Sequence, residues 1–251
     1  MNFIIFIALF LLLLFGFYIS FRNDLKLKVE CISMYSDNKR RDNLLNHIKM
    51  VGFDSCDFSF FNAIKPKTLS NKYKEYTQSV KDTRLACWQS HVDVWKKYKD
   101  FKEPILVLED DVRFIKDFPG KLNNILDVLK NIEWDMCFLG RKEVEDDDNN
   151  IPLNTCDLEI VKNNFFETHC YLFNPNKLIR LLQCDISNVN LDNVTTTLAK
   201  ENKNLAIDTY ISYLMKQNKL NIIGVKNQLA EQISTEAGIF SILDNYQSTT
   251  S

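Results

Sequence analysis

Apolar and polar positions separate an N-terminal segment from the rest of the chain. Met1 to Phe21 contains no charged side chain and is dominated by Ile, Leu and Phe. A helix needs roughly 20 apolar residues to cross the hydrocarbon core of a bilayer, and the bulky residues up to Phe21 differ from the small-residue cleavage site of a signal peptide. We therefore predict a transmembrane anchor over residues 1–22 and a single-pass membrane location. A cleaved signal peptide is the alternative.

The chain after this segment alternates between strand-like and helix-like patterns. Apolar or alternating runs predict strands at 25–34, 58–64, 105–108, 136–140, 169–173 and 222–225. Apolar residues at helical spacing predict helices at 40–50, 84–99, 118–131 and 208–217, and one from 174 onward that buries Leu178, Ile179, Leu181 and Leu182. Strands that alternate with helices are typical of an α/β fold with a mostly parallel sheet flanked by helices. We assign residues 23–241 to this one domain and 242–251 to a polar tail.

Two polar stretches interrupt the pattern. The Lys- and Tyr-rich stretch 67–82 predicts a surface loop or a mobile flap, and the acidic stretch 143–150 predicts a solvated loop to which we assign no site. Between them, Ile105 to Leu108 is a continuous apolar run. Such a run is typical of a strand that is buried on both faces of its sheet.

Composition excludes some classes of function. The 31 Lys and Arg residues nearly balance the 33 Asp and Glu residues. The chain therefore offers no basic surface of the kind that binds nucleic acid, and we expect no nucleic-acid partner. The 7 cysteines include no CxxC pair, so no structural zinc site is predicted. Most of these thiols are expected to pack in the core as small apolar side chains.

The apolar run at 105–108 ends in three consecutive acids, Glu109, Asp110 and Asp111. Open α/β sheets bind ligands at the carboxyl ends of their strands, and hard cations such as Mg²⁺ and Mn²⁺ prefer oxygen ligands. The triplet therefore predicts a metal site. If extended geometry continued through the triplet, Glu109 and Asp111 would face one side and Asp110 the other, which makes Asp111 the first candidate ligand. A charged turn after a core strand is the alternative.

Several short motifs follow one another along the chain. They are Ile32-Ser33-Met34 with Arg40 and Arg41, Cys87 with Ser90, His91 and Trp95, Leu108 to Asp111, Trp134-Asp135 before Phe138-Leu139-Gly140, Thr168 to Phe173, and Ile207-Asp208. Their order, from about Val29 to Val225, resembles glycosyltransferase family 25. This family includes bacterial lipooligosaccharide galactosyltransferases and procollagen galactosyltransferases.

The resemblance implies a GT-A type nucleotide-sugar transferase fold, a UDP-sugar donor and Mn²⁺ or Mg²⁺ as cofactor. It implies metal ligands at Asp111, Asp110 and Glu109, catalytic residues at Asp208 (the base) and Glu109, and donor contacts from Ser33, Arg40, Arg41, Ser90, His91 and Asp110. Four of these residues have a plainer alternative. Asp208 is alternatively a helix cap, Arg40 and Arg41 are solvated charges, and His91 is a packed core histidine. His169 is a candidate third metal ligand, with a core histidine as the alternative.

The activity implied by the resemblance is metal-dependent, inverting transfer of a hexose, galactose above all. The acceptor would be a hydroxyl of a glycan, a lipid-linked glycan or a protein. Thr83 and Ala86 replace glycines of the family pattern and Arg84 replaces a glutamate. These departures leave open an inactive protein that only binds nucleotide sugar or glycan. A metal-dependent phosphohydrolase is a third reading, against which the presence of only 3 histidines counts.

The side of the membrane stays open at this level. Arg22, Lys26 and Lys28 follow the apolar segment, and positive residues in that position favour a cytoplasmic domain. A type II transferase of the secretory pathway would instead place its domain in the lumen.

Overall fold

Eight strands form one central sheet in the computed structural model, which describes residues 27–69, 82–143, 149–153, 157–189, 194 and 205–233. No helix in this part of the chain combines the length and the apolar composition that crossing a bilayer requires. This finding contradicts the single-pass membrane location expected from the sequence. Residues 1–22, to which that expectation referred, lie outside the described residues, as does the predicted polar tail at 242–251.

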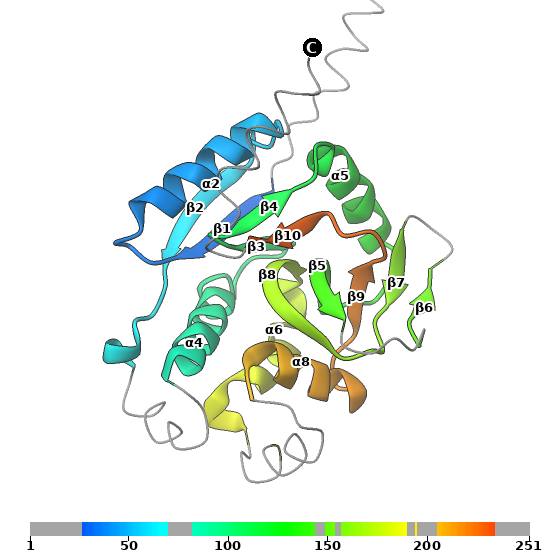
Figure 1. The fold of residues 1–251 in the computed structure, drawn as a ribbon. Helices are drawn as coiled ribbons and strands as arrows, with labels where there is room; N and C mark the ends of the chain where they lie inside the picture. Colours follow the sequence, from blue (N-terminus) through cyan, green and yellow to red (C-terminus); the bar gives the residue numbers. More distant parts are fainter. Residues whose placement is uncertain are drawn as a thin grey trace, which may run out of the picture.

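The sheet has the strand order β2-β1-β3-β8-β5-β9-β7-β6, and a two-stranded sheet of β4 and β10 accompanies it (Figure 1). The strands are β1 (Lys28–Ser33), β2 (Asp57–Asn62), β3 (Ile105–Glu109), β4 (Val112–Phe114), β5 (Met136–Glu143), β6 (Ile151–Pro152), β7 (Leu158–Ile160), β8 (Phe165–Phe173), β9 (Ile222–Val225) and β10 (Ala230–Gln232). The helices are α2 (Asn38–Met50), α4 (Asp82–Lys97), α5 (Phe118–Leu129), α6 (Leu178–Leu181) and α8 (Ile207–Lys216), with 3-10 turns η1 (Pro66–Thr68), η2 (Pro175–Lys177), η3 (Leu182–Cys184) and η4 (Ile186–Asn188).

The sheet is mixed, although most of its strands share one direction. β1 runs parallel to β2 and to β3, and β5 runs parallel to β9. β8 is antiparallel to both of its neighbours, β3 and β5, and β7 is antiparallel to both β9 and β6. The expectation of an α/β fold is therefore confirmed, and the mostly parallel sheet is confirmed for all strands except these two.

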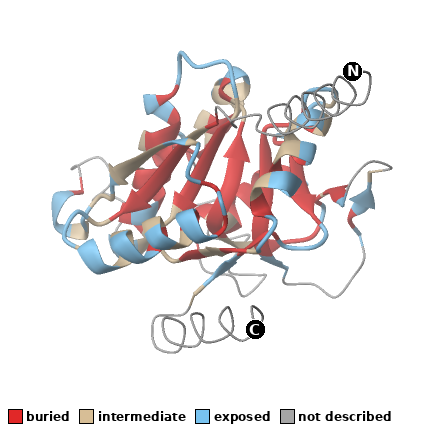
Figure 2. Cartoon of the chain, turned by 90° about the horizontal axis from the view of Figure 1, so that it is seen from above, coloured by how far each residue is buried: buried red, intermediate tan, exposed pale blue. Residues whose placement is uncertain are grey.

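Helices cover both faces of the sheet, as the continuous apolar run in β3 predicts. Ile105 and Val107 of β3 pack in one core cluster with residues of α4, α6 and α8. Leu106 and Leu108 pack in the other with residues of α2 and α5. The side chains of successive strand residues point to opposite faces, so a strand that is apolar throughout serves two cores. Figure 2 shows these buried strands between helices whose outer surfaces are exposed.

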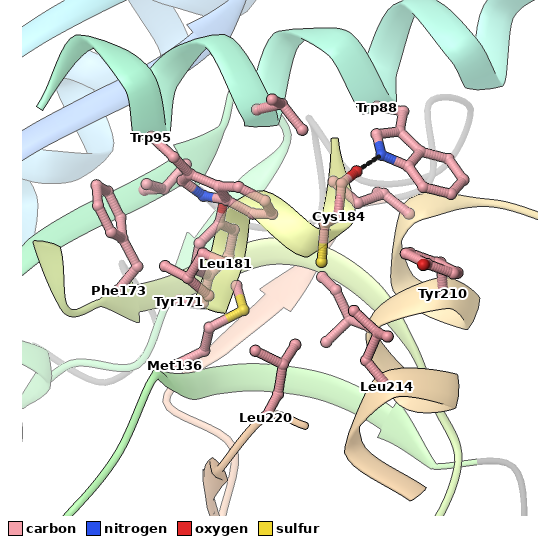
Figure 3. Close-up of a cluster of buried hydrophobic side chains, with 14 of the residues drawn as sticks. Trp88, Trp95, Met136, Tyr171, Phe173, Leu181, Cys184, Tyr210, Leu214 and Leu220 are labelled. Atoms are coloured by element: carbon pink, nitrogen blue, oxygen red, sulfur yellow. Dashed lines mark hydrogen bonds between the residues drawn. The ribbon is translucent and has the colours of Figure 1, made fainter. Parts of the chain in front are cut away.

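The cluster beneath α4 contains the largest side chains. Trp88 and Trp95 of α4 are both fully buried, and Trp88 Nε1 donates a hydrogen bond of 2.6 Å to the carbonyl oxygen of Cys184 (Figure 3). Trp95 Nε1 donates one of 2.9 Å to the hydroxyl of Tyr171 on β8. Each indole therefore buries its ring without leaving its N–H unpaired. These contacts hold α4 against η3 and β8. They thereby set the orientation of the whole helix, including the residues of α4 that lie near the strand ends.

One predicted helix is broken up. The stretch from residue 174 contains η2, the four-residue α6 and η3 in place of one continuous helix. Ile179, predicted to be buried, is 88% exposed, whereas Leu181 is fully buried. Neighbouring residues on a helix differ by about 100° in direction. This single turn therefore buries Leu181 and turns Ile179, two positions earlier, outward.

The two predicted loops are described only in part. Of the stretch 67–82, residues 67–68 belong to η1 and Asp82 begins α4, while residues 70–81 lie outside the described residues. Of the acidic stretch 143–150, Glu143 ends β5 and residues 144–148 lie outside the described residues.

Candidate active site at the carboxyl ends of β1 and β3

The acid triplet lies at the carboxyl end of a central strand. Glu109 is the last residue of β3, and Asp110 and Asp111 form the turn that leads into β4. In the parallel pairing of β1 with β3, Ile32 lies opposite Glu109, which brings Ser33 to the same edge of the sheet. Ligands of open α/β sheets bind at this edge.

Arg40 lies between the two aspartates of the turn. Its Nη2 atom is 3.1 Å from Asp110 Oδ1 and 2.8 Å from Asp111 Oδ2. The Arg40 backbone N–H in turn donates a hydrogen bond of 3.2 Å to Asp37, which caps α2. The side chains of Asp110 and Asp111 are only 7% and 16% exposed, against 31% for Arg40. The first turn of α2 thus places a cation against two largely buried carboxylates.

Burial raises the pKa values of both aspartates, and the positive charge of Arg40 opposes that rise. Burial raises the pKa of Asp110, although a hydrogen bond from Ser33 and the positive charge of Arg40 partly oppose the rise. Burial also raises the pKa of Asp111, and the negative charge of Glu109 adds to it, while Gln232 and Arg40 lower it. Raised pKa values at adjacent carboxylates mark a site where further positive charge is favourable.

Glu109 faces a different set of partners. Its Oε1 atom accepts a hydrogen bond of 2.8 Å from the Thr168 hydroxyl and lies 3.4 Å from His91 Nε2. Although burial opposes ionisation, the contacts with His91 and Thr168 lower the pKa of Glu109 overall. Nδ1 of His91, which is fully buried, is 2.8 Å from the Tyr171 hydroxyl. Glu109 is therefore held as a carboxylate beside an oriented imidazole.

The triplet does not keep the alternation expected from an extended chain. Asp110 and Asp111 both reach Arg40, whereas Glu109 turns towards α4 and β8. The physical reason is that the strand ends at Glu109 and the next two residues form a turn. A side chain alternates from face to face only while the backbone remains extended.

Asp208 lies in the first turn of α8 and is held from two directions. Its Oδ2 accepts a hydrogen bond of 3.0 Å from the backbone N–H of Glu167, and its Oδ1 accepts one of 2.7 Å from the backbone N–H of Thr209. Burial raises the pKa of Asp208, these two hydrogen bonds lower it, and the negative charge of Glu109 raises it further. The charge of Glu109 thus acts on Asp208, and the role of Asp208 as base stays a prediction.

A strained backbone position supports this contact. Glu167 has a φ of 76°, in the left-handed region that a residue with a Cβ seldom adopts. The pairing of β8 with β5 shifts register nearby, between Phe138 and Gly140 and again between Gly140 and Lys142. Such irregularities re-aim side chains and backbone groups beside functional sites. Here the bend directs the Glu167 N–H at Asp208.

Other predicted donor residues are engaged by the fold itself. Ser90 accepts a hydrogen bond of 2.9 Å from the Ile64 N–H and donates one of 2.7 Å to the Ala86 carbonyl. Arg41 donates to the Ser33 hydroxyl, the Ser33 carbonyl and the Asn62 side chain, at 3.1, 3.1 and 3.0 Å. These contacts tie α2, β1 and β2 together behind the acids. Donor contacts from Ser33, Arg41 and Ser90 therefore stay predictions.

His169 is enclosed in the core. It is fully buried, and its Nε2 lies 3.2 Å from the carbonyl oxygen of Ala230 on β10. Its Nδ1 is 3.5 Å from Glu167. His169 thus has the burial of a core histidine, although its Nδ1 has no hydrogen-bond partner among the described residues, and its role as a third metal ligand stays a prediction.

The aspartate pair fits a hard divalent cation. Carboxylate oxygens are the ligands that Mg²⁺ and Mn²⁺ prefer. Asp111 Oδ1 is buried and has no hydrogen-bond partner among the described residues, and an unpaired buried carboxylate oxygen is costly unless something compensates it. Arg40 supplies only part of that compensation, so the turn can accept a cation.

Sequence reasoning missed Thr168 and Gln232. Thr168 lies inside a predicted motif, but the approach of its hydroxyl to Glu109 depends on β8 pairing beside β3. Gln232 of β10 donates a hydrogen bond of 3.1 Å to Asp111 Oδ2, across 121 positions of sequence. The two strands β4 and β10 were too short to show a pattern, so no signal pointed to this contact.

Comparisons with known proteins point to one family. Residues 27–195 match the family model described as "Glycosyltransferase family 25 (LPS biosynthesis protein)". Procollagen galactosyltransferase 2 of Homo sapiens is 30% identical over 128 residues, which are 45% of this chain and 20% of that protein. Inactive glycosyltransferase 25 family member 3 of Homo sapiens is 35% identical over 63 residues, 24% of this chain and 11% of that protein.

The likenesses are partial or distant. The chain spans about a fifth of the length of the curated relatives it matches over the longest alignments. Among solved structures, a glycosyltransferase involved in glycosylation of the major capsid of PBCV-1 is similar at 11% identity and a TM-score of 0.40, covering 89% of this chain and 98% of that one. That score carries no argument about function.

Proposed function

This chain belongs to glycosyltransferase family 25, and from that premise we propose that it transfers a hexose, galactose first among the candidates, from a UDP-sugar to a hydroxyl acceptor. A GT-A type fold for nucleotide-sugar binding accords with its α/β sheet and with its acids at a strand end. The acceptor class is a glycan, a lipid-linked glycan or a protein hydroxyl.

One observation carries the proposal: two largely buried aspartates and one arginine converge at the carboxyl ends of β1 and β3. Asp110 and Asp111 would hold Mn²⁺ or Mg²⁺, which when bound offsets the charge of the departing diphosphate. Arg40 then presents its guanidinium to a phosphate, for which its planar donor geometry is suited. The site thus combines the groups that a nucleoside diphosphate requires.

Asp208 is our candidate for the general base. In the transfer, the acceptor oxygen forms a bond to the anomeric carbon while the bond from that carbon to the β-phosphate oxygen breaks. The diphosphate leaves with the electron pair of that bond, and the acceptor proton passes to the Asp208 carboxylate. Attack from the face opposite the leaving group would invert the configuration. Burial raises the pKa of Asp208, which makes it a stronger base than an exposed aspartate.

A second candidate is a protein that binds nucleotide sugar without turnover. Two observations favour it: the similarity to a relative whose name describes it as inactive, and the replacement of the family pattern by Thr83, Arg84 and Ala86 at the start of α4. The intact aspartates and Arg40 favour the active enzyme.

Release of nucleoside diphosphate from a panel of nucleotide sugars with Mn²⁺ tests the proposal. We expect release from one UDP-sugar, and its loss with a chelator or in Asp111→Asn. Asp127→Asn is the matched control, because Asp127 is 72% exposed on α5 and pairs only with Lys130 among the described residues. Binding of UDP without release would favour the second candidate. Neither binding nor release, in a folded protein, would contradict the proposal.

A further inference from the structure

We propose that Cys87, His91 and Glu109 form a second metal site, separate from the aspartate pair, that binds a thiophilic transition-metal ion such as Zn²⁺. One ligand atom from each, a thiol sulfur, an imidazole nitrogen and a carboxylate oxygen, lie within 4.8 Å of one another. The sequence motifs contain Cys87 with His91 and, separately, Glu109, but only the fold brings the residues of α4 and β3 together.

The helix and the strand supply the ligands in a suitable arrangement. Cys87 and His91 are four residues apart on α4, so their side chains lie on one face of the helix. Glu109 comes from the end of β3, with its Oε1 3.4 Å from His91 Nε2. Zinc binds sulfur at about 2.3 Å and nitrogen or carboxylate oxygen at about 2.0–2.2 Å. Ligand atoms spaced as these are can therefore surround one ion after small side-chain adjustments.

The neighbours of this group hold two of the ligands in place. The Tyr171 hydroxyl is 2.8 Å from His91 Nδ1 and also accepts a hydrogen bond from Trp95. This contact fixes the imidazole ring, with Nε2 3.4 Å from Glu109 Oε1 and 3.3 Å from the Thr168 hydroxyl. The Thr168 hydroxyl donates to Glu109 and so orients the carboxylate. Metal-binding histidines and carboxylates are commonly oriented by such outer hydrogen bonds.

The chemistry of the ligands separates this group from the aspartate pair. Thiolate and imidazole select zinc and similar ions, whereas carboxylates alone suit Mg²⁺ and Mn²⁺. Asp110 and Asp111 meet Arg40 on their own side of the turn, whereas Glu109 faces His91. We therefore assign Glu109, expected from the sequence to be a ligand with the two aspartates, to this second group, so that the two sites share no ligand. Three protein ligands leave a fourth position on zinc for water or another molecule.

Binding would change the protonation of this site. The Cys87 thiol would release its proton to solvent when its sulfur binds the ion. Resting on the proposed function, we also expect Zn²⁺ to inhibit transfer, because it would engage His91, an expected donor contact, and Glu109, an expected catalytic residue. Binding itself does not depend on that function.

Titration of the metal-free full chain with Co²⁺ tests the site directly. Cobalt bound to a cysteine thiolate gives a sulfur-to-cobalt charge-transfer band, and addition of Zn²⁺ should remove it. We expect one equivalent of Co²⁺ to produce the band, and Cys87→Ser to abolish it. Cys56→Ser is the matched control, because Cys56 is another free cysteine that is not buried, and it is far from the acids in sequence. Asp111→Asn should keep the band while it impairs the aspartate pair.

Two outcomes would overturn the site. One is the absence of a charge-transfer band in the unaltered protein. The other is a band that survives Cys87→Ser, whether or not Cys56→Ser removes it. If Cys87→Ser does not fold, Glu109→Gln tests the same site from its carboxylate ligand, with an expected loss of at least about tenfold in Co²⁺ affinity. A loss of transferase activity alone, without a change in the band, would concern the proposed function and not this site.

Discussion

The surroundings of Asp208 determine the position and the pKa of its carboxylate. It lies in the first turn of α8, where a helix N-terminus favours negative charge, and it accepts backbone hydrogen bonds from Glu167 and Thr209. Burial and the charge of Glu109 oppose these effects and leave the pKa of Asp208 raised. The N-cap of α8 is Ala206 and not Asp208, so the helix-cap alternative is wrong in that form, and the role of Asp208 as base stays a prediction.

Replacement of Asp208 by Asn should therefore act on the chemical step. We expect kcat to fall by about 10²–10⁴-fold, the usual contribution of a general base, with a smaller change in the KM for the donor. Since the base must be ionised and its pKa is raised, activity of the unaltered protein should fall with decreasing pH at a higher pH than an ordinary aspartate would give. This acid limb should vanish in Asp208→Asn.

Steady-state kinetics across pH, with Asp127→Asn as control, measure both effects. The effect of pH on stability is opposite to its effect on activity. Because the pKa is raised in the folded state, the contribution of Asp208 to stability is present at low pH and is lost as pH rises through that pKa. An unchanged kcat, or an acid limb that persists in Asp208→Asn, would refute the role of Asp208 as base.

At the scale of elements, β5, β8 and β10 are packed too closely for a larger residue at one position. A Cβ added to Gly140 on β5 would lie 2.2 Å from the carbonyl oxygen of Ala230 and 2.3 Å from His169 Nε2. Both neighbours are buried, and β10 also carries Gln232, which contacts Asp111. A shift of β10 would therefore be felt at the candidate site.

Gly140→Ala should lower the free energy of unfolding by about 1–3 kcal/mol, as overpacking of a filled core does. Gly120→Ala is the matched control, since Gly120 lies in α5 and its added Cβ would meet only the side chain of Asp117. Because alanine favours a helix by about 1 kcal/mol over glycine, this control should be neutral or stabilising. Urea denaturation of both variants compares them, and equal stabilities would contradict the packing argument.

The sequence predicted the long elements well, because they carry strong periodic patterns. The β9 range was predicted as found, and α2, α4 and α5 lie within about two residues of their predicted bounds. The short strands β4, β6, β7 and β10 were missed, since two or three residues are too few to show alternation. The continuous helix expected from residue 174 was wrong. Two 3-10 turns and a four-residue α-helix occupy this stretch, and their apolar spacing resembles that of one helix.

For the whole molecule, the sequence predicted the position of the site but not its internal arrangement. An acid triplet after an apolar run indicated a strand end, and the order of motifs indicated the family. The division of the triplet, with Asp110 and Asp111 towards Arg40 and Glu109 towards His91, depends on where β3 stops. The antiparallel insertion of β8, which brings Thr168 to Glu109, depends on long-range pairing that periodicity does not reveal.

The central claim is that Asp110, Asp111 and Arg40 bind a nucleoside diphosphate together with a divalent cation. Calorimetric titration of the full chain with UDP, in the presence and absence of Mn²⁺, tests this most directly. The account predicts that Mn²⁺ strengthens UDP binding by about 5–150-fold, the usual range for coupled ligands, and that Asp111→Asn but not Asp127→Asn removes this gain. Equal UDP affinity with and without Mn²⁺, or no UDP binding by the folded protein, would contradict it.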